Sequence, residues 1–366
     1  MRKFLATAVV VAMATPAFAG LSLDTRYDYV SATSNSKTTS TSTGLSAFQF
    51  SRLRLAGAGQ AGEVNFKTRL NFLNFGAVTQ TVSDGMNGNT AKSVPVATAA
   101  TGLLLSGQPS YQPNDLVDFA YAESSIFEGL NWQAGKLADV GFSGFEGQYS
   151  GGDMYFTSQS YLANKYFTGA QLIYTLADNQ KMGFAFLNNN AATDQTRPSV
   201  GLWYFGTFGN FGVRASYHSL AQGVSGTKDI NQQPLNVGVS YKMDDWKFEL
   251  DYDAQTITNS AVSGNGQTLS SIVGTARYDL GHWSPWVKIE SSSRQGYQTA
   301  GADVTDTATN FSIAGEYKKN AADPFRYELA YVSGSTTYAT QAGVTNASVT
   351  GAYAYAGIRY MGDFLK

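Results

Sequence analysis

The feature that most constrains this chain is a two-residue alternation of apolar and polar side chains. In the stretch VNFKTRLNF, residues 64–72, the apolar Phe66 and Leu70 alternate with Lys67 and Arg69. Successive side chains of a β-strand point to opposite faces, so such a segment has one apolar face and one polar face. The pattern favours strands over amphipathic helices, in which apolar residues recur every three or four positions.

About sixteen such segments follow one another, and after the first of them long and short connections alternate. The long connections contain polar stretches such as residues 31–44 and 194–199, whereas the short connections lie at residues 57–62, 177–180 and 207–210. A soluble β-sandwich, the alternative, gives no reason for this alternation. Bacterial outer-membrane barrels do, because they have short periplasmic turns and long extracellular loops.

We therefore predict an all-β fold, a transmembrane antiparallel up-and-down β-barrel of about sixteen strands with short periplasmic turns and long extracellular loops. The barrel must be closed because an open sheet edge would leave backbone groups unpaired in hydrocarbon. Charged residues make up 14% of the chain and aromatic residues 13%. The mean hydropathy of −0.20 argues against a bundle of membrane-spanning helices.

The first residues predict export. A basic start, MRK, is followed by a short apolar core at residues 4–14 and by an Ala-Phe-Ala motif ending at Ala19. This core is shorter than the roughly 20 residues of a spanning helix, which disfavours the alternative of an anchor. We predict a signal peptide over residues 1–19 and a single barrel domain over residues 20–366.

Charge and cysteine content exclude several classes of function. The formal net charge is −2, so no overall basic field suggests a nucleic-acid partner. There is no cysteine, which excludes disulfides and thiolate metal sites. We expect no cofactor and no metal centre; calcium sites built from oxygen ligands in the external loops stay open.

Two features suggest chemistry but lack the required context. Residues 57–62, GAGQAG, match a dinucleotide fingerprint, yet a strand pattern follows where that motif needs a helix. His218 lies on the predicted inward face and His282 in a predicted periplasmic turn. A barrel hydrolase built on His218 is an alternative, but its strand supplies no acid at a suitable spacing to orient the histidine.

The inward face of the first three predicted strands is rich in cations. Its five positively charged residues are Arg26, Arg52, Arg54, Lys67 and Arg69. The second and third strands form a hairpin, so we expect the two pairs of cations on them to be close neighbours. Like charges are costly in a dry core, which favours a water-filled pore. The alternative is a wall of cations paired with Asp24, Asp28 and Glu63.

The third external loop has a distinct composition. Residues 137–156 combine glycines and aromatic residues with the acids Asp139, Glu146 and Asp153. The other long connections are mostly rich in Ser and Thr. Its aromatic content suggests that this loop packs against another surface, and we expect that surface to be the inside of the barrel.

Taken together, the signal peptide, the alternating strands and the loop pattern resemble a Gram-negative outer-membrane porin over the whole mature chain. The resemblance implies a homotrimer and a third loop that folds inward and narrows the pore. It also implies that Asp139, Glu146 and Asp153 face the cations of the early strands. Residues 53–72 are also similar to the early hairpin of phosphate-selective porins. Porins usually end in an aromatic residue, whereas here two residues follow Phe364.

We therefore predict an outer-membrane channel that is not an enzyme and that admits small hydrophilic solutes and ions by passive diffusion, through a constriction made by the third external loop. Its expected partners are outer-membrane lipid, those solutes and further copies of itself. The runner-up is an anion- or phosphate-selective channel. A non-conducting structural barrel and the hydrolase are the remaining alternatives.

Overall fold

The computed structural model describes residues 18–36, 41–74, 79–82, 92–95, 117–137, 145, 167–188, 199–224, 228–259, 266–299, 302–320, 322–338 and 347–365. Nearly all of these residues lie in β-strands. In these ranges no helix is long and apolar enough to cross a membrane. Residues 1–17 of the predicted signal peptide fall outside the described residues, and the first strand begins at Phe18.

The chain forms eighteen strands in the described ranges. The first nine are β1 (Phe18–Ser36), β2 (Thr41–Ala61), β3 (Val64–Asn74), β4 (Thr79–Val82), β5 (Lys92–Pro95), β6 (Val117–Phe127), β7 (Leu130–Leu137), β8 (Phe167–Ala177) and β9 (Gln180–Leu187). The others are β10 (Ser199–Phe208), β11 (Phe211–Val224), β12 (Lys228–Met243), β13 (Trp246–Asn259), β14 (Gly266–Tyr278), β15 (Trp283–Thr299), β16 (Ala302–Tyr317), β17 (Phe325–Tyr338) and β18 (Ala347–Leu365).

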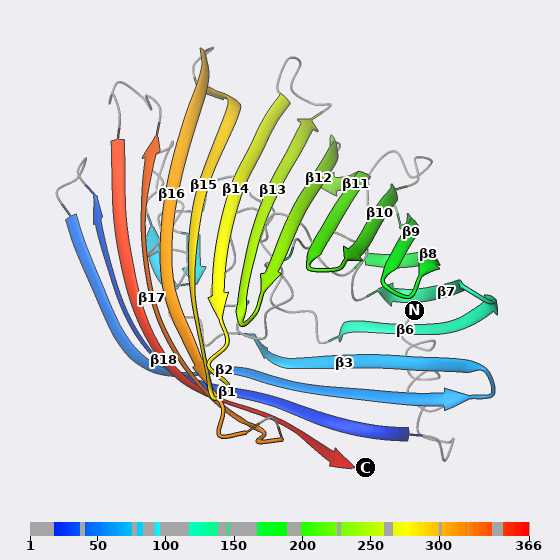
Figure 1. The fold of residues 1–366 in the computed structure, drawn as a ribbon. Helices are drawn as coiled ribbons and strands as arrows, with labels where there is room; N and C mark the ends of the chain where they lie inside the picture. Colours follow the sequence, from blue (N-terminus) through cyan, green and yellow to red (C-terminus); the bar gives the residue numbers. More distant parts are fainter. Residues whose placement is uncertain are drawn as a thin grey trace.

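Sixteen of these strands close into one barrel, and β4 and β5 pair separately. Consecutive barrel strands are antiparallel neighbours, and β1 closes the ring by pairing with β18 from Leu21 to Ser36 (Figure 1). Closure gives every strand of the barrel a hydrogen-bonded neighbour on both sides, which a hydrocarbon environment requires. The predicted all-β up-and-down barrel of about sixteen strands is confirmed.

The short connections are tight turns between successive strands. The turn between β2 and β3 contains only Gly62 and Glu63, with Gly62 at a φ of 60°, a left-handed conformation that favours glycine. Residues 57–61 of the GAGQAG motif belong to β2. A strand therefore continues through most of the glycines, and β3 follows directly, so the motif has no helix that could bind a pyrophosphate.

Alternation along each strand separates an apolar outer face from an inner face. On β9 the outward Phe184 is 48% exposed while its neighbour Ala185 is fully buried, and on β13 the outward Leu250 is 50% exposed while Asp251 is 2% exposed. Burial of charged side chains and exposure of large apolar ones is the reverse of a soluble domain. It is the arrangement of a barrel that faces lipid.

A β-bulge near Ser51 restores this alternation along β2. Arg26 of β1 pairs with Arg52, whereas the next residue, Tyr27, pairs with Phe50, so Ser51 is the extra residue. The sequence predicts this position, because Phe48 and Phe50 are out of phase with Leu53. The bulge lets the arginines below it face inward and Phe48 above it face outward.

The wall of the barrel is uneven in height. Strands β1, β2 and β18 contain 19, 21 and 19 residues, whereas β7 and β9 contain 8 each. Figure 1 shows the long strands β15–β18, β1 and β2 on one side and the short strands β7–β10 on the other. In the described residues, the wall is therefore taller on the side of the long strands.

Candidate functional site

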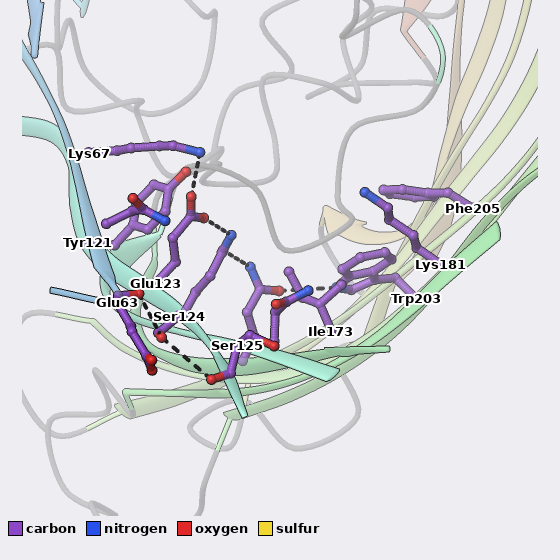
Figure 2. A pocket seen from close by; sticks show the side chains of 14 residues that line it. Glu63, Lys67, Tyr121, Glu123, Ser124, Ser125, Ile173, Lys181, Trp203 and Phe205 are labelled. Carbon is purple, nitrogen blue, oxygen red and sulfur yellow. Dashed lines mark hydrogen bonds and ion pairs between the residues drawn. The ribbon is translucent and has the colours of Figure 1, made fainter. Parts of the chain in front are cut away.

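A cavity of about 650 Å³ lies against the inner wall of β3 and β6–β10. Glu63, in the turn between β2 and β3, belongs to its lining and places the cavity toward the end of the barrel that carries the short turns. Its other polar lining residues are Asn65, Lys67, Tyr121, Glu123, Ser124, Ser125, Asn131, Gln133, Gln171 and Lys181. Figure 2 shows Lys67, Tyr121 and Glu123 on one side, facing Lys181 and Phe205 on the other.

A chain of hydrogen bonds crosses the wall of this cavity. Trp203 Nε1 donates to Gln171 Oε1 at 3.2 Å, and Gln171 Nε2 donates to Gln133 Oε1 at 2.7 Å. Gln133 Nε2 then donates to Glu123 Oε2 at 2.9 Å, and Lys67 Nζ lies 2.6 Å from Glu123 Oε1. Every donor points toward Glu123, so the aligned dipoles reinforce one another and stabilise its negative charge.

The chain can reach Trp203 because a glycine stands between the two strands that it joins. Trp203 is on β10 and Gln171 on β8, and a Cβ at Gly183 of β9 would overlap the Trp203 indole ring. The Trp203 ring also stacks on Phe205 at 4.6 Å between centroids. Arg214 makes a cation–π contact with Phe205, because its Cζ lies 4.1 Å from the centroid of that ring.

The predicted cation Arg26 is buried and paired. Its guanidinium contacts Asp28 Oδ1 at 3.2 Å and Glu328 Oε2 at 2.9 Å. It also donates to the hydroxyl of Tyr355, which in turn donates to Glu328 at 2.9 Å. Two carboxylates therefore neutralise this one guanidinium, which limits its attraction for a passing anion.

A second paired group surrounds Asp24. Arg359 of β18 donates to both of its carboxylate oxygens at 2.7 Å, a bidentate fork, and Arg52 lies 3.4 Å from Oδ2. Arg54 is also buried and faces inward. The pairing of the early arginines with Asp24 and Asp28 follows the alternative stated from the sequence. Glu63, the third acid of that alternative, is exposed in a turn.

The expected closeness of the two cation pairs of the first hairpin holds for one pair of residues. Arg54 pairs with Asn71 and Arg69 with Ala56, so these two arginines are diagonal neighbours on the inner face, whereas Lys67 pairs with Ala58. The sequence interpretation treats residues 57–62 as the turn, but β2 continues to Ala61 and shifts the pairing by several residues. Lys67 instead forms its ion pair with Glu123 of β6.

Arg69 has an aromatic neighbour. Its Cζ lies 4.9 Å from the centroid of the Phe119 ring of β6. It pairs with Ala56, one inward position along β2 from Arg54. The five predicted cations thus divide into a buried group on β1 and β2 and a more exposed group on β3.

A buried carboxylate on the opposite wall is held by neutral donors. Glu290 of β15 is 1% exposed. It accepts hydrogen bonds from Ser271 at 3.1 Å, Ser292 at 2.6 Å and Asn310 at 3.0 Å. The inner wall therefore carries negative as well as positive groups along its circumference.

His218 faces inward as predicted but is fully buried. Its ring lies across β10, where a Cβ at Gly201 would overlap it. Complete burial gives the imidazole no access to a substrate in this structure. His282 is exposed in the turn between β14 and β15, as predicted. Among the described residues, no three acidic or histidine side chains form a group that could hold a metal ion.

The three acids predicted for the third loop, Asp139, Glu146 and Asp153, lie outside the described residues. One residue of that loop is described. Phe145 is 7% exposed, and its backbone N–H donates to Asp251 Oδ1 of β13 at 3.2 Å. Because Asp251 faces inward, Phe145 lies inside the barrel. The aromatic content of the loop is the signal in the sequence that points to such packing.

The residues that the sequence did not single out are mostly neutral. Gln133, Gln171 and Trp203 link the cavity wall, and Glu328 and Arg359 complete the ion pairs of β1. All five sit at inward positions of their strands. The alternation of side chains along each strand predicts that these residues face the lumen, but it does not predict which neighbouring strands their side chains contact.

The comparisons with known proteins agree on the architecture. Outer-membrane expressed OmpT of Vibrio cholerae has a TM-score of 0.57 at 14% identity, covering 93% of this chain and 97% of that chain. In-vitro folded OmpT of Vibrio cholerae, in its trimer form, has a TM-score of 0.53 at 13% identity and covers 94% and 100%. The anion-selective porin from Comamonas acidovorans has a TM-score of 0.55 at 12% identity and covers 93% and 99%.

The fold is that of an outer-membrane porin. No protein-family model matches the chain, and no curated protein matches it. At these low identities the likeness to solved porins concerns the fold alone, so the function of this porin-like barrel rests on its own residues.

Proposed function

We propose that this porin-like barrel forms a water-filled channel for passive diffusion of small hydrophilic solutes and ions. The observation that carries the proposal is the division of each strand into an apolar outer face and an inner face with charged and amide side chains, around a polar cavity of about 650 Å³. A barrel with a polar interior and an apolar exterior provides an aqueous path through lipid.

Selection in such a channel acts through size and charge. The inner wall presents cations and acids in turn: Arg26, Arg52 and Arg359 beside Asp24, Asp28 and Glu328, and Lys67 beside Glu123. Because these charges neutralise one another, we propose a weak preference between cations and anions. The third external loop, which carries Phe145 into the lumen, is proposed to narrow the path.

A stronger preference for anions is the second candidate. One protein with a similar fold is an anion-selective porin. In this chain, Lys181 lies on the cavity wall opposite Lys67 and is exposed, and no hydrogen bond or ion pair of its side chain occurs in the described ranges. An unpaired ammonium in the lumen attracts anions, including phosphate.

We place the channel in the outer membrane of a Gram-negative bacterium, after removal of residues 1–19. A homotrimer is proposed because a barrel of this fold, OmpT of Vibrio cholerae, is known in a trimer form. No catalytic step is proposed, since the buried His218 is the inward histidine on which a hydrolase would depend.

Single-channel recording in a planar bilayer tests the proposal. Purified, folded protein should give stepwise conductance, and liposomes containing it should swell in small sugars but not in large ones. The reversal potential under a salt gradient then distinguishes the two proposed channels. A reversal potential near zero supports the weakly selective channel, and one close to the equilibrium potential of the anion supports the anion-selective channel. Folded protein without conductance steps would leave a structural barrel, and turnover that depends on His218 would favour the hydrolase.

A further inference from the structure

The cavity against β3 and β6–β10 has hydrogen-bond donors that its own wall does not use. The Lys67 ammonium carries three N–H donors, and its ion pair with Glu123 engages one of them. Within the described ranges, the side chain of Lys181 forms no hydrogen bond or ion pair, and the hydroxyl of Tyr121 forms no hydrogen bond. Figure 2 shows Lys67 and Tyr121 on one side of the cavity and Lys181 on the other. Spare donors therefore face the cavity from two sides.

The acceptors along the hydrogen-bond chain of this wall are already engaged. Glu123 accepts a hydrogen bond from Gln133 at 2.9 Å and pairs with Lys67 at 2.6 Å. Gln133 Oε1 accepts from Gln171, and Gln171 Oε1 accepts from Trp203. A surface with spare donors and engaged acceptors is complementary to a ligand group that only accepts hydrogen bonds. An ionised carboxylate is such a group.

The charges that line the cavity are unevenly paired. Lys67 and Glu123 neutralise one another, whereas Lys181 on β9 has no ion-pair partner among the described residues. The remaining acid, Glu63, lies in the exposed turn between β2 and β3, on the side of the cavity away from Lys181 (Figure 2). A ligand that brings one negative charge to Lys181 therefore supplies the partner that the wall does not.

Apolar side chains lie next to this cation. Phe205 is directly opposite Lys181 across the β9–β10 ladder, and Ile173 and Trp203 are both opposite Gly183. All three apolar residues line the cavity. Because Gly183 has no side chain, the Trp203 ring lies over β9, and the apolar surface continues from β8 to β10. The cavity therefore combines a cation with an adjoining apolar wall.

We propose that this cavity binds a small organic monocarboxylate with an apolar body, aromatic or branched-chain. The carboxylate contacts Lys181, and the apolar body contacts Ile173 and Phe205. The cavity volume of about 650 Å³ lies within the range of small-molecule sites, roughly 300–1,000 Å³. The proposal rests on the channel function proposed above and names a class of solute for that channel. It differs from general attraction of anions because it requires the apolar contacts as well as the charge.

Calorimetric titration of the folded protein in detergent with sodium benzoate tests this binding without requiring conductance. Acetate keeps the carboxylate but lacks the apolar body, and benzyl alcohol keeps the ring but lacks the charge. Lys181→Gln removes the ammonium, and Ile173→Asn removes part of the apolar wall. Lys242→Gln is the matched control, because Lys242 also lies one residue from the turn end of its strand but outside the cavity lining. Folding of each variant is verified by its heat-dependent mobility on a gel.

Benzoate should bind to the wild type saturably and about tenfold more tightly than acetate or benzyl alcohol. Lys181→Gln should weaken benzoate binding about five- to tenfold, because a charge-assisted contact is lost. Ile173→Asn should weaken it about three- to fivefold, because less apolar surface is buried. Lys242→Gln should bind benzoate as the wild type does.

Equal affinity for benzoate and acetate, or for benzoate and benzyl alcohol, would overturn the inference. So would wild-type affinity for benzoate in the folded Lys181→Gln variant. Recordings in planar bilayers, made in parallel, distinguish these outcomes from failure of the channel proposal. Conductance steps without benzoate binding would overturn the binding site alone, whereas folded protein that binds benzoate but does not conduct would overturn the channel proposal and leave the site.

Discussion

Replacing Leu172 with arginine should destabilise the barrel, whereas the same change at the adjacent Ile173 should not. Leu172 is 44% exposed on the outer face of β8, while Ile173 points inward and lines the cavity. The two positions have the same strand, the same neighbours along the chain and almost the same depth. They differ in whether the new charge meets lipid or water.

The magnitude follows from the depth of Leu172 in the membrane. A strand tilted by about 45° rises roughly 2.4 Å per residue along the membrane normal. Leu172 is five residues from the end of β8 at Ala177, about 12 Å above the periplasmic end of the strand and near the middle of an apolar band about 25 Å tall. At this depth an arginine facing lipid costs about 2–4 kcal/mol.

Depth also predicts a weaker effect at Phe66. This residue is exposed to lipid but is the third residue of β3 after the short turn. An arginine there can extend to the interface, so Phe66→Arg should cost only about 0–1 kcal/mol. The three variants together therefore separate the effect of face from the effect of depth.

Urea unfolding of the barrel in lipid vesicles measures these free energies. The expected order of destabilisation is Leu172→Arg, then Phe66→Arg, with Ile173→Arg close to the wild type. If Ile173→Arg destabilises the protein as much as Leu172→Arg, the assignment of inner and outer faces on β8 is wrong. Equal costs at Leu172 and Phe66 would refute the argument from depth.

Three further substitutions test the site. Lys67→Glu should leave the barrel folded, because an exposed ion pair contributes about 1 kcal/mol or less. It should shift the reversal potential toward cation preference, because it adds a second carboxylate beside Glu123. An unchanged reversal potential would show that Lys67 does not line the conducting path. Arg26→Ala should lower the free energy of unfolding by about 3 kcal/mol, because buried carboxylates lose their cation; wild-type stability in urea would contradict this. Gly183→Ala should cost about 1–3 kcal/mol by displacing the Trp203 ring, with a shifted tryptophan emission, and an unshifted spectrum would count against the packing.

The sequence predicts the barrel well because alternation and connection length are local signals. The period of two in the segment VNFKTRLNF falls within β3, and the phase change around Ser51 marks the bulge. Each of these depends only on the chirality and pleat of the strand, which every residue shares.

The site is harder to predict because it depends on register and on contacts between distant segments. Moving the β2–β3 turn by a few residues changes the partner of Lys67 from an arginine to Ala58, which alters the electrostatics of the wall. Its ion-pair partner, Glu123, lies more than fifty residues away in sequence. Phe145 likewise meets its hydrogen-bond acceptor Asp251 across 106 residues of sequence, a contact that no local pattern indicates.

The short strands have a consequence for the surrounding membrane. The eight residues of β7 or β9 have a contour of about 27 Å and, when tilted, cover about 19 Å of the membrane normal, less than an apolar band of about 25 Å. Hydrophobic mismatch of this kind costs fractions of a kcal/mol per Å. We predict that lipid beside β7 and β9 thins or that a neighbouring copy replaces it there, whereas β8 and β10, with 11 and 10 residues, cover about 24–26 Å of the membrane normal.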